Sequence, residues 1–309
     1  MNNKRQTALV VLSGGQDSTT CLYWALKNFI HVRAVTFDYG QRHKCEIEAA
    51  QQIVDLAGIG PDNHEVVTLD TLAGRSPLTD PSAELETYVS PAQMAATIGD
   101  RVELTFVPMR NAVFMTYAAN RAIAAGIYDL VLGVCQEDNA NYPDCRQSYV
   151  WAMEHAINLA LGLDRTGVRF NVHTPLMTLT KAKSVDLAVT LGAYYALGFS
   201  HTAYSGEYPP ETQDHATVLR AKGFEEANLP DPLILRAWCA GLIELPPTRN
   251  YDRMKGIYDM TPLAYAEAVP EVVRGFLARL EVRGGFAIKS PPGVAYDVHH
   301  GNYPSDGLF

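Results

Sequence analysis

The sequence predicts a doubly wound α/β fold, in which helices cover both faces of a parallel sheet. Short apolar runs alternate with longer amphipathic stretches from the start of the chain to about residue 195. The apolar runs are continuous rather than alternating, as in strands that are buried on both faces. The chain has 309 residues, of which 47% are hydrophobic. It can therefore bury a substantial core without metal ions or disulfides.

The predicted elements follow one another in a regular order. The candidate strands are ALVVLS at 8–13, VRAVTFDYG at 32–40, EVVTLD at 65–70, DLVLGV at 129–134 and VRFNVHTPL at 168–176. The candidate helices are the amphipathic stretches at 17–29, 45–58, 111–126, 147–162 and 181–192. Helical stretches of this length between strands are typical of the crossover connections that a parallel sheet needs.

The regular alternation is interrupted once and then ends. A loop of mixed composition at about 72–103 is long enough for a functional lid or a disordered insertion. From about Leu197, Tyr, Pro, Gly and Asp accumulate, and the stretches LPDPL and ELPPTRNY break any regular pattern. The stretch at 262–283 predicts one further helix, and we expect the tail at 288–309 to be irregular.

Composition and charge argue against several classes of protein. The net charge of −9 gives no basic field to hold a long nucleic-acid backbone, although it leaves room for a local basic pocket. No apolar run approaches the roughly 18 residues of a membrane span, and the N-terminal apolar stretch is too short for a secretory signal. We therefore expect a cytoplasmic protein. The five widely spaced cysteines form no C-x-x-C pair, which indicates reduced, mostly buried thiols.

The stretch SGGQDS at 13–18 lies between the first strand and the first helix. Its glycines let the backbone approach a ligand, and the helix start offers unpaired N–H groups and a partial positive charge. Ser13, Ser18 and Thr19 add hydroxyl donors. No Lys follows at the helix start, so this is not a Walker motif. The pattern indicates a phosphate-binding loop, and the alternative is a tight turn with an ordinary Ser or Asp helix cap.

Six motifs in order resemble the 7-cyano-7-deazaguanine (preQ0) synthase family, within the N-type ATP pyrophosphatases of the PP-loop superfamily. They are LSGGQDSTTC, VTFDYGQRH, TFVPMRN, GVCQEDNANYPDCR, TPLMTLTKA and LRAKGFEEANLPDP, and they span roughly residues 7–235. The resemblance implies an adenine nucleotide alpha hydrolase-like α/β domain at 1–195. The remainder, 196–309, is a C-terminal region, irregular to helical, with a degenerate zinc-motif segment at 196–235 and a family-atypical extension at 236–309.

The resemblance also implies the site. Catalytic roles fall to Ser13, Asp17, Ser18 and Lys181. ATP binding falls to Leu12, Ser13, Gly14, Gly15, Gln16, Asp17, Ser18, Thr19, Arg42 and Arg110. Substrate binding falls to Tyr39, Tyr142, Pro143, Asp144 and Arg146. Mg²⁺ is expected at Asp17 through the phosphates, and no separate nucleophile is needed.

Each landmark also has a physical interpretation. Arg42 and His43 follow the second strand, at the ligand edge of the sheet, where they could meet phosphate. Arg110 lies at a helix start, where it can clamp phosphate. Lys181 also lies at a helix start, where the dipole disfavours a cation unless an anion is nearby. Met109 stands where the family usually has Gly, and its side chain could crowd the approach to the ligand. Ordinary solvated side chains are the alternative for each basic residue.

The loop at 133–146 suits recognition of a deazaguanine base. Its candidate side chains are Glu137, Asp138, Tyr142, Asp144 and Arg146. A carboxylate can contact the amidine-like edge of the base through two hydrogen bonds, and an aromatic ring can stack on its face. A solvated polar loop is the alternative.

The chain departs from the family at the zinc site, where family members carry four cysteines. Here Ala203, Glu211, Asp214 and Thr217 stand at those positions. Glu211 and Asp214, with His201 and His215, could ligate a metal in principle, but thiolates dominate structural zinc sites. We therefore predict that the zinc site is lost, and that other packing, such as the C-terminal extension, holds this turn.

The main functional prediction is that ATP adenylates the carboxylate of 7-carboxy-7-deazaguanine, and that ammonia then yields the amide and finally the nitrile. An alternative is transfer of the activated deazaguanine to an amine on a partner protein, as in bacterial antiphage defence systems. A second alternative is a non-catalytic nucleotide-binding scaffold. The extension could supply the surface for a homodimer or a protein partner.

Overall fold

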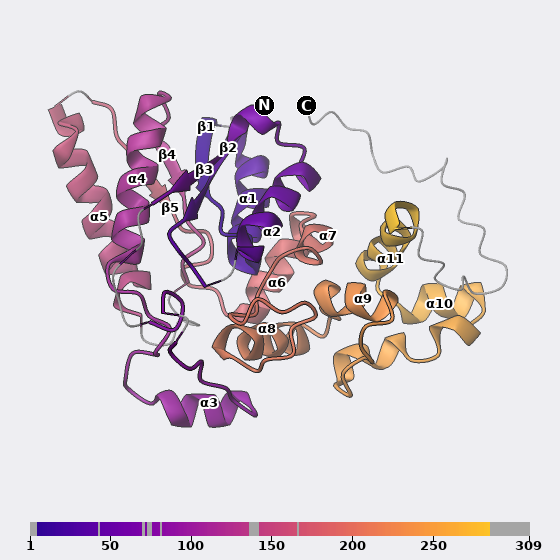
Figure 1. The fold of residues 1–309 in the computed structure, drawn as a ribbon. Helices are drawn as coiled ribbons and strands as arrows, with labels where there is room; N and C mark the ends of the chain where they lie inside the picture. Colours follow the sequence, from indigo (N-terminus) through magenta and orange to yellow (C-terminus); the bar gives the residue numbers. More distant parts are fainter. Residues whose placement is uncertain are drawn as a thin grey trace. The chain divides into compact units, whose positions relative to one another are not determined.

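The computed structural model describes residues 5–42, 44–69, 72, 76–80, 82–135, 142–165 and 167–284. Within these residues, five strands form one sheet in the order β3-β2-β1-β4-β5 (Figure 1). The strands are β1 (Arg5–Val11), β2 (Phe29–Asp38), β3 (His64–Thr68), β4 (Asp129–Val131) and β5 (Asn171–His173). Each neighbouring pair is parallel, which confirms the predicted α/β fold.

Helices cover both faces of the sheet. Those that lie on it are α1 (Gln16–Asn28), α2 (Cys45–Leu56), α4 (Arg110–Ala124), α5 (Gln147–Ala160) and α6 (Lys181–Thr190). On one face, α4 and α5 pack against Leu9 of β1. On the other face, α1 and α2 pack against Ala8 and Val10 of the same strand. Neighbouring residues of β1 thus point to opposite faces, as the period of a strand requires.

The strand order reverses in the middle of the sheet. After β1 the chain continues to β2 and β3 on one side, and then crosses to β4 and β5 on the other. Leu9 and Val10 of β1 pair with Leu130 and Val131 of β4. Because the loops that follow two such strands diverge, a crevice forms at their carboxyl ends. The loop after β1 carries SGGQDS, so this motif lies at the crevice.

The segment predicted as a long loop, 72–103, contains the helix α3 (Pro91–Ile98). Ser90 caps this helix, accepting the backbone N–H of its third residue at 3.1 Å. Its apolar side chains pack with Tyr88 and Val218. Eight residues are too few for a stable isolated helix, so tertiary packing provides much of its stability.

The region after Leu197 holds more regular structure than its Pro and Gly content predicts. It follows α7 (Tyr194–Leu197) and contains α8 (His215–Glu226) and α9 (Pro232–Cys239). In LPDPL, the carboxylate of Asp231 accepts the backbone N–H of Leu233 at 2.9 Å, and Pro232 is the first helical residue. Proline is favourable at that position because its missing N–H would be unpaired anyway. The stretch therefore starts a helix.

The prediction of a single helix at 262–283 was wrong. The structure has α10 (Pro262–Ala268) and α11 (Glu271–Gly284), with Pro270 between them. Proline has no backbone N–H and excludes the helical conformation from the residue before it. Val269 is accordingly extended, with φ −96° and ψ 127°.

The chain divides into two compact units, Met1–Leu245 and Pro246–Phe309. The first unit contains the sheet with α1 to α9, and the second contains α10 and α11. The finer division into 1–195, 196–235 and 236–309 stays a prediction. The tail at 288–309 lies outside the described residues.

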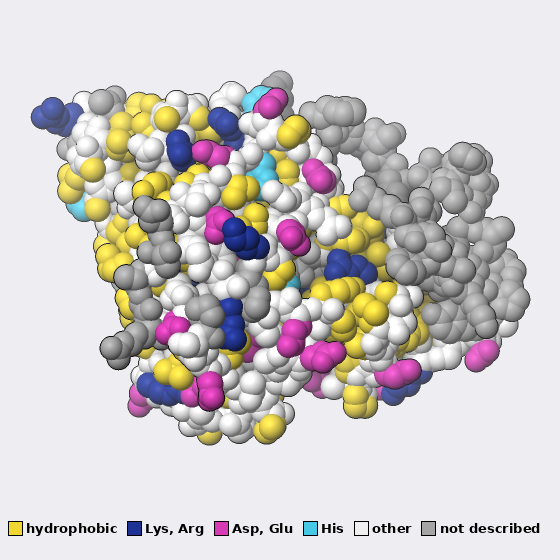
Figure 2. All heavy atoms as spheres, viewed as in Figure 1, with side chains coloured by type: hydrophobic (Ala, Val, Ile, Leu, Met, Phe, Trp, Pro, Cys, Tyr) yellow, Lys and Arg dark blue, Asp and Glu magenta, His cyan; other side chains and the backbone are white. Residues whose placement is uncertain are grey.

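The surface carries charges of both signs. Figure 2 shows Lys and Arg side chains interspersed with Asp and Glu side chains on the face that it draws. In the part of the chain that the structure describes, no helix is both long enough and apolar enough to cross a membrane.

Candidate active site

A pocket lies at the carboxyl ends of β1, β2 and β4 and encloses about 300 Å³. This is the lower end of the range for small-molecule sites. Residues at the starts of α1, α4, α6 and α8 line it, so four helices direct their N-terminal ends at one space. A helix start carries a partial positive charge, and no side chain caps the starts of α1 and α4. This arrangement suits an anionic ligand.

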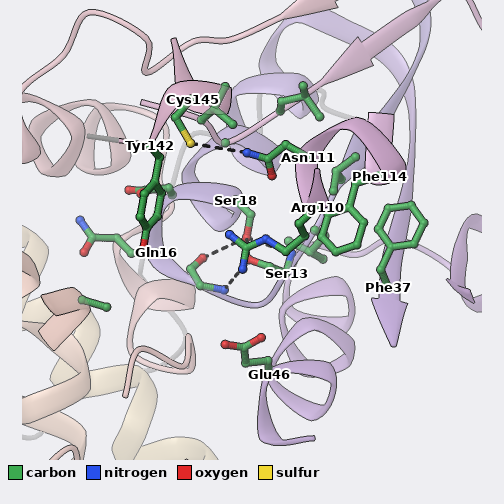
Figure 3. Close-up of a pocket in the computed structure, with 18 of the residues that line it drawn as sticks. Ser13, Gln16, Ser18, Phe37, Glu46, Arg110, Asn111, Phe114, Tyr142 and Cys145 are labelled. Atoms are coloured by element: carbon green, nitrogen blue, oxygen red, sulfur yellow. Dashed lines mark hydrogen bonds between the residues drawn. The ribbon is translucent and has the colours of Figure 1, made fainter. Parts of the chain in front are cut away.

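The loop between β1 and α1 is tightly folded. The Ser18 hydroxyl accepts the backbone N–H of Ser13 at 3.2 Å and lies 3.0 Å from the Ser13 hydroxyl (Figure 3). Gly14 has a φ of +84°, and a Cβ there would lie 2.3 Å from the backbone oxygen of Glu46. A Cβ on Gly133, after β4, would lie 2.9 Å from the Ser18 nitrogen. Both close approaches require glycine.

The start of α1 offers donors to a ligand. Its N-cap is Gly15, and no side chain caps the helix there. The buried amide nitrogen Nε2 of Gln16 has no hydrogen-bond partner among the described residues. A buried donor without a partner is costly, and a ligand oxygen in the pocket could accept this hydrogen bond.

An ion pair joins α1 to α6 across the pocket. The Lys181 ammonium lies 2.9 and 3.1 Å from the two carboxylate oxygens of Asp17. The carboxylate supplies the nearby anion that a cation at a helix start needs. The stem of Lys181 passes α8 at Gly223, where a Cβ would lie 2.4 Å from the Lys181 Cγ. The absence of a side chain on α8 thus creates the path by which this lysine reaches the loop.

The Arg110 side chain extends into the pocket beside the glycine loop (Figure 3). Burial alone would lower the pKa of Arg110, but the phenols of Tyr39, Tyr142 and Tyr204 raise it, so the guanidinium stays charged. Glu46 lines the same pocket from α2. Burial raises the pKa of Glu46 to about 7, and the charge of Arg110 opposes that rise.

Tyr142 is held by a buried carboxylate that the sequence did not predict. Its hydroxyl donates to Glu103 Oε2 at 3.0 Å and lies 2.5 Å from the Thr105 hydroxyl. The backbone N–H of Thr105 donates to the same carboxylate oxygen at 2.8 Å. Burial and the Glu103 charge raise the pKa of Tyr142, so the phenol keeps its proton. This network fixes the ring at the pocket wall.

The structure brings most of the predicted site residues to this pocket. Those that line it are Leu12, Ser13, Gly15, Gln16, Asp17, Ser18, Tyr39, Arg110, Tyr142, Asp144 and Lys181. Arg42 lines a small adjoining chamber.

Besides Arg42, four predicted residues that the structure describes do not line the pocket. Gly14 packs on α2, and Thr19 is buried, donating its hydroxyl to the Gly15 oxygen at 2.7 Å. Pro143 and Arg146 are exposed. His43, Glu137 and Asp138 lie outside the described residues. The individual roles of all these residues stay predictions.

The backbone conformation of Met109 accounts for the glycine that the family usually has at this position. Its φ of 63° and ψ of 5° are left-handed, a conformation that glycine adopts without strain. The Met109 side chain is 65% exposed, and it does not line the pocket. It therefore does not crowd the ligand.

Hydrogen bonds hold the segment at the zinc-motif positions. The Asp214 carboxylate accepts the backbone N–H groups of Thr217 at 2.9 Å and of Tyr204 at 2.6 Å. Ala203 is buried and Glu211 is exposed. Across the described ranges, no group of three or more His, Cys, Asp or Glu side chains is placed to hold a metal ion.

Titratable pocket residues that were not predicted to bind nucleotide or base include Glu46, Tyr204 and His215. Glu46 follows the motif VTFDYGQRH, and Tyr204 lies in the segment that holds the zinc-motif positions, so a predicted feature lies beside each. His215 was considered only as a metal ligand. Burial lowers the pKa of His215, against the charge of Glu103, so it enters the pocket as a neutral ring near pH 7.

The chain is similar to known proteins over about three quarters of its length. The family described as queuosine biosynthesis protein QueC matches residues 7–228. The 7-cyano-7-deazaguanine synthase of Laribacter hongkongensis is 50% identical over 235 residues, 74% of this chain and 94% of the relative. That of Chromobacterium violaceum is also 50% identical over 235 residues, covering 75% and 94%. That of Gloeobacter violaceus is 46% identical over 230 residues, covering 73% and 94%. The chain belongs to the QueC family of queuosine biosynthesis proteins.

Proposed function

We propose that this chain converts 7-carboxy-7-deazaguanine into 7-cyano-7-deazaguanine at the expense of ATP, as the names of its relatives suggest. The observation that carries the proposal is the pocket at the switch point. There, four helix starts, Lys181 and Arg110 gather positive charge around a glycine loop. Such a site suits a triphosphate that must be held while it is split.

In the first step, the loop at 13–18 and the N–H groups of α1 hold the pyrophosphate part of ATP. A carboxylate oxygen of the base attacks the α-phosphorus, and the bond to the bridging oxygen breaks, so pyrophosphate leaves. Lys181 and Arg110 stabilise the negative charge on the phosphates. The resulting acyl adenylate carries AMP as a good leaving group.

Ammonia then attacks the carbonyl carbon, and AMP leaves to give the amide. A second ATP adenylates the amide oxygen. Loss of AMP and of the amide protons gives the nitrile. Because each half of the reaction forms an adenylate with loss of pyrophosphate and then releases AMP, the same positively charged pocket serves both halves.

Tyr142 and Asp144 are our candidates for recognition of the base. The Asp144 carboxyl is buried, which raises its pKa, while the charge of Arg110 lowers it. Asn111 donates to the Asp144 backbone oxygen at 3.4 Å and so ties this segment to the start of α4. A carboxylate at this wall can accept two hydrogen bonds from the amidine-like edge, with the Tyr142 ring against the face.

Asp17 is our candidate for contact with Mg²⁺. In nucleotide sites this ion is held by one or two carboxylates together with the phosphates, so a single carboxylate beside the loop fits. Bound there, the ion would neutralise phosphate charge. The Lys181 ammonium that now pairs with Asp17 would be available to the phosphates.

The test is turnover of ATP with the carboxylate substrate and ammonium, followed by mass spectrometry. We expect AMP, pyrophosphate and the nitrile. Asp17→Ala should abolish AMP formation, whereas Asp55→Ala, at an exposed position on α2, should not change it. Unchanged turnover in Asp17→Ala would contradict the nucleotide assignment.

The same experiment separates the alternative functions. AMP without nitrile, together with a mass gain on a co-purified protein, would favour transfer to a protein amine. No AMP under any condition would favour a scaffold. The Asp17–Lys181 pair, held between two helices, is a group that a scaffold does not need.

A further inference from the structure

A small chamber adjoins the candidate active site. It is lined by Tyr39, Gln41, Arg42, Cys45, Glu46, Leu78, His201, Ala203 and Tyr204. Glu46, Tyr39 and Tyr204 also line the main pocket, so the two spaces meet at these side chains. The chamber encloses about 10 Å³, which is the room that one water-sized molecule needs. Ammonia is a molecule of that size.

Several polar groups of the chamber wall are already engaged. Gln41 accepts the Tyr39 backbone N–H at 2.9 Å and donates to the Phe37 oxygen at 3.3 Å. The Arg42 guanidinium donates to the Ala83 oxygen at 3.3 Å. These bonds fix the turn after β2 as a rigid wall. Among the described lining residues, Glu46 supplies the carboxylate.

The charges around Glu46 favour passage of neutral ammonia, rather than ammonium, from the chamber into the main pocket. Arg110 of α4 acts on Glu46 from that side. The other titratable or charged groups that line the chamber are Tyr39 and Arg42 after β2, Cys45 on α2, and His201 and Tyr204 after α7. An ammonium ion can pair with the Glu46 carboxylate, but the Arg110 charge opposes its further movement as a cation. Ammonia, once neutral, meets no such barrier.

We propose that this chamber is the ammonia site of the enzyme and that Glu46 takes the proton of the incoming ammonium. This inference rests on the proposed function. An N–H bond of ammonium breaks and its proton passes to the Glu46 carboxylate. The freed lone pair forms the C–N bond with the acyl adenylate, and the C–O bond to AMP breaks with its electron pair on AMP. The attacking nitrogen loses a second proton to solvent, which leaves the neutral amide.

The size of the chamber decides between two sources of amine. A lysine side chain or a chain terminus of a partner protein carries several heavy atoms, and a space for one water-sized molecule does not admit it. An amine that enters through this chamber is therefore free ammonia. Proton transfer from ammonium needs a base whose pKa lies near the working pH. The pKa of Glu46, about 7, lets its carboxyl group accept and return a proton near neutral pH.

The test separates adenylation from amide formation. In Glu46→Gln, we expect carboxylate-dependent exchange of pyrophosphate into ATP to stay within about twofold, while amide formation from ammonium falls on the order of 10²-fold. Hydroxylamine is already neutral at pH 7, so product formation from it should be close to wild type in this variant. The matched control is Glu48→Gln, an exposed carboxylate on the same helix, which should leave all three rates unchanged.

A second variant tests the chamber without touching the carboxylate. Ala203 is buried at the chamber wall, and Ala203→Val adds volume there. We expect the KM for ammonium to rise at least tenfold, with pyrophosphate exchange retained and the melting temperature recorded for both variants.

Two results with Glu46→Gln would overturn the inference. One is wild-type amide formation from ammonium; the other is an equal loss with ammonium and hydroxylamine. Transfer of the deazaguanine to a protein amine that survives in Ala203→Val would also contradict it. If the wild-type chain shows no carboxylate-dependent exchange, the proposed function itself has failed, and the inference falls with it.

Discussion

Gly223 determines where Lys181 can lie. A Cβ at this position of α8 would lie 2.4 Å from the Lys181 Cγ and 3.0 Å from its Cβ. These atoms belong to the inner part of the lysine stem, so they cannot yield by a rotation at the far end of the side chain. We expect Gly223→Ala to displace the ammonium from Asp17 and to lower AMP formation on the order of 10²-fold, as small misplacements of catalytic groups do. Steady-state assays of AMP release measure this.

A double-mutant cycle shows whether the effect runs through the lysine. In a Lys181→Ala background the stem is gone, and Gly223→Ala should then cause little further loss. Ala221→Ser, an exposed change on the same helix, is the control. An equal loss in both backgrounds would mean that Gly223 acts through the packing of α6 against α8 instead.

Glu46 makes stability depend on pH. Burial raises the pKa of this carboxyl from its usual value near 4.5 to about 7, against the charge of Arg110. The folded chain then binds more protons than the unfolded chain between these values, so stability falls as the pH rises through this window. We expect Glu46→Gln to raise the melting temperature at pH 8 relative to wild type, and to have little effect at pH 4.

Calorimetry at the two pH values measures the difference. Glu48→Gln, which removes an exposed carboxylate from the same helix, should show no such pH dependence. A melting temperature for Glu46→Gln below that of wild type at pH 8 would contradict the assignment of a raised pKa.

At the scale of the element, Asp214 joins the start of α8 to the segment after α7. Its carboxylate is buried and accepts the N–H groups of Thr217 and Tyr204. Asp214→Ala leaves both donors without this partner, and we expect it to lower the free energy of unfolding by about 2 kcal/mol. Because Tyr204 lines the pocket, the KM for the substrate should also rise. Urea unfolding and steady-state kinetics measure the two effects.

Ser90→Ala provides the matched control for this helix cap. It removes the cap of α3, whose residues do not line the pocket. We expect a loss of about 1 kcal/mol with no change in the substrate KM. An unchanged KM in Asp214→Ala would mean that this cap stabilises the fold without positioning the site.

The elements also show how far local patterns reach. The sequence predicted the five strands and the helices between them, because each has a period or an apolar run of its own. It did not predict α3, and it treated the Pro-rich start of α9 as irregular. Periodicity over 262–283 outweighed Pro270, which ends one helix and separates it from the next. In these places, one capping or helix-breaking residue decides the structure.

For the whole molecule, the active site belongs to the first compact unit. Every residue that lines the pocket or the chamber lies within Met1–Leu245. We expect a chain that ends after Leu245 to form AMP at a rate within about threefold of wild type, since a compact unit can fold alone. A chain that ends at Ala227, without α9, should be unstable, because Leu233 and Leu235 of that helix are buried.

Circular dichroism with AMP-release assays distinguishes the outcomes. A folded but inactive chain ending after Leu245 would show that the second unit contributes to the site. That result would contradict the assignment of the site to the first unit alone.

By itself, the sequence determined the order of strands and helices, the glycine loop and the motifs that identify the family. These features are local, since each depends on residues that are neighbours along the chain. Only the tertiary structure decided which polar groups meet. Lys181 and Asp17 are 164 residues apart, and Tyr142 and Glu103 are 39 residues apart. The ammonia-sized chamber likewise combines segments from both ends of the first unit. No local pattern encodes such contacts, because they form only when the packing of the sheet brings distant loops together.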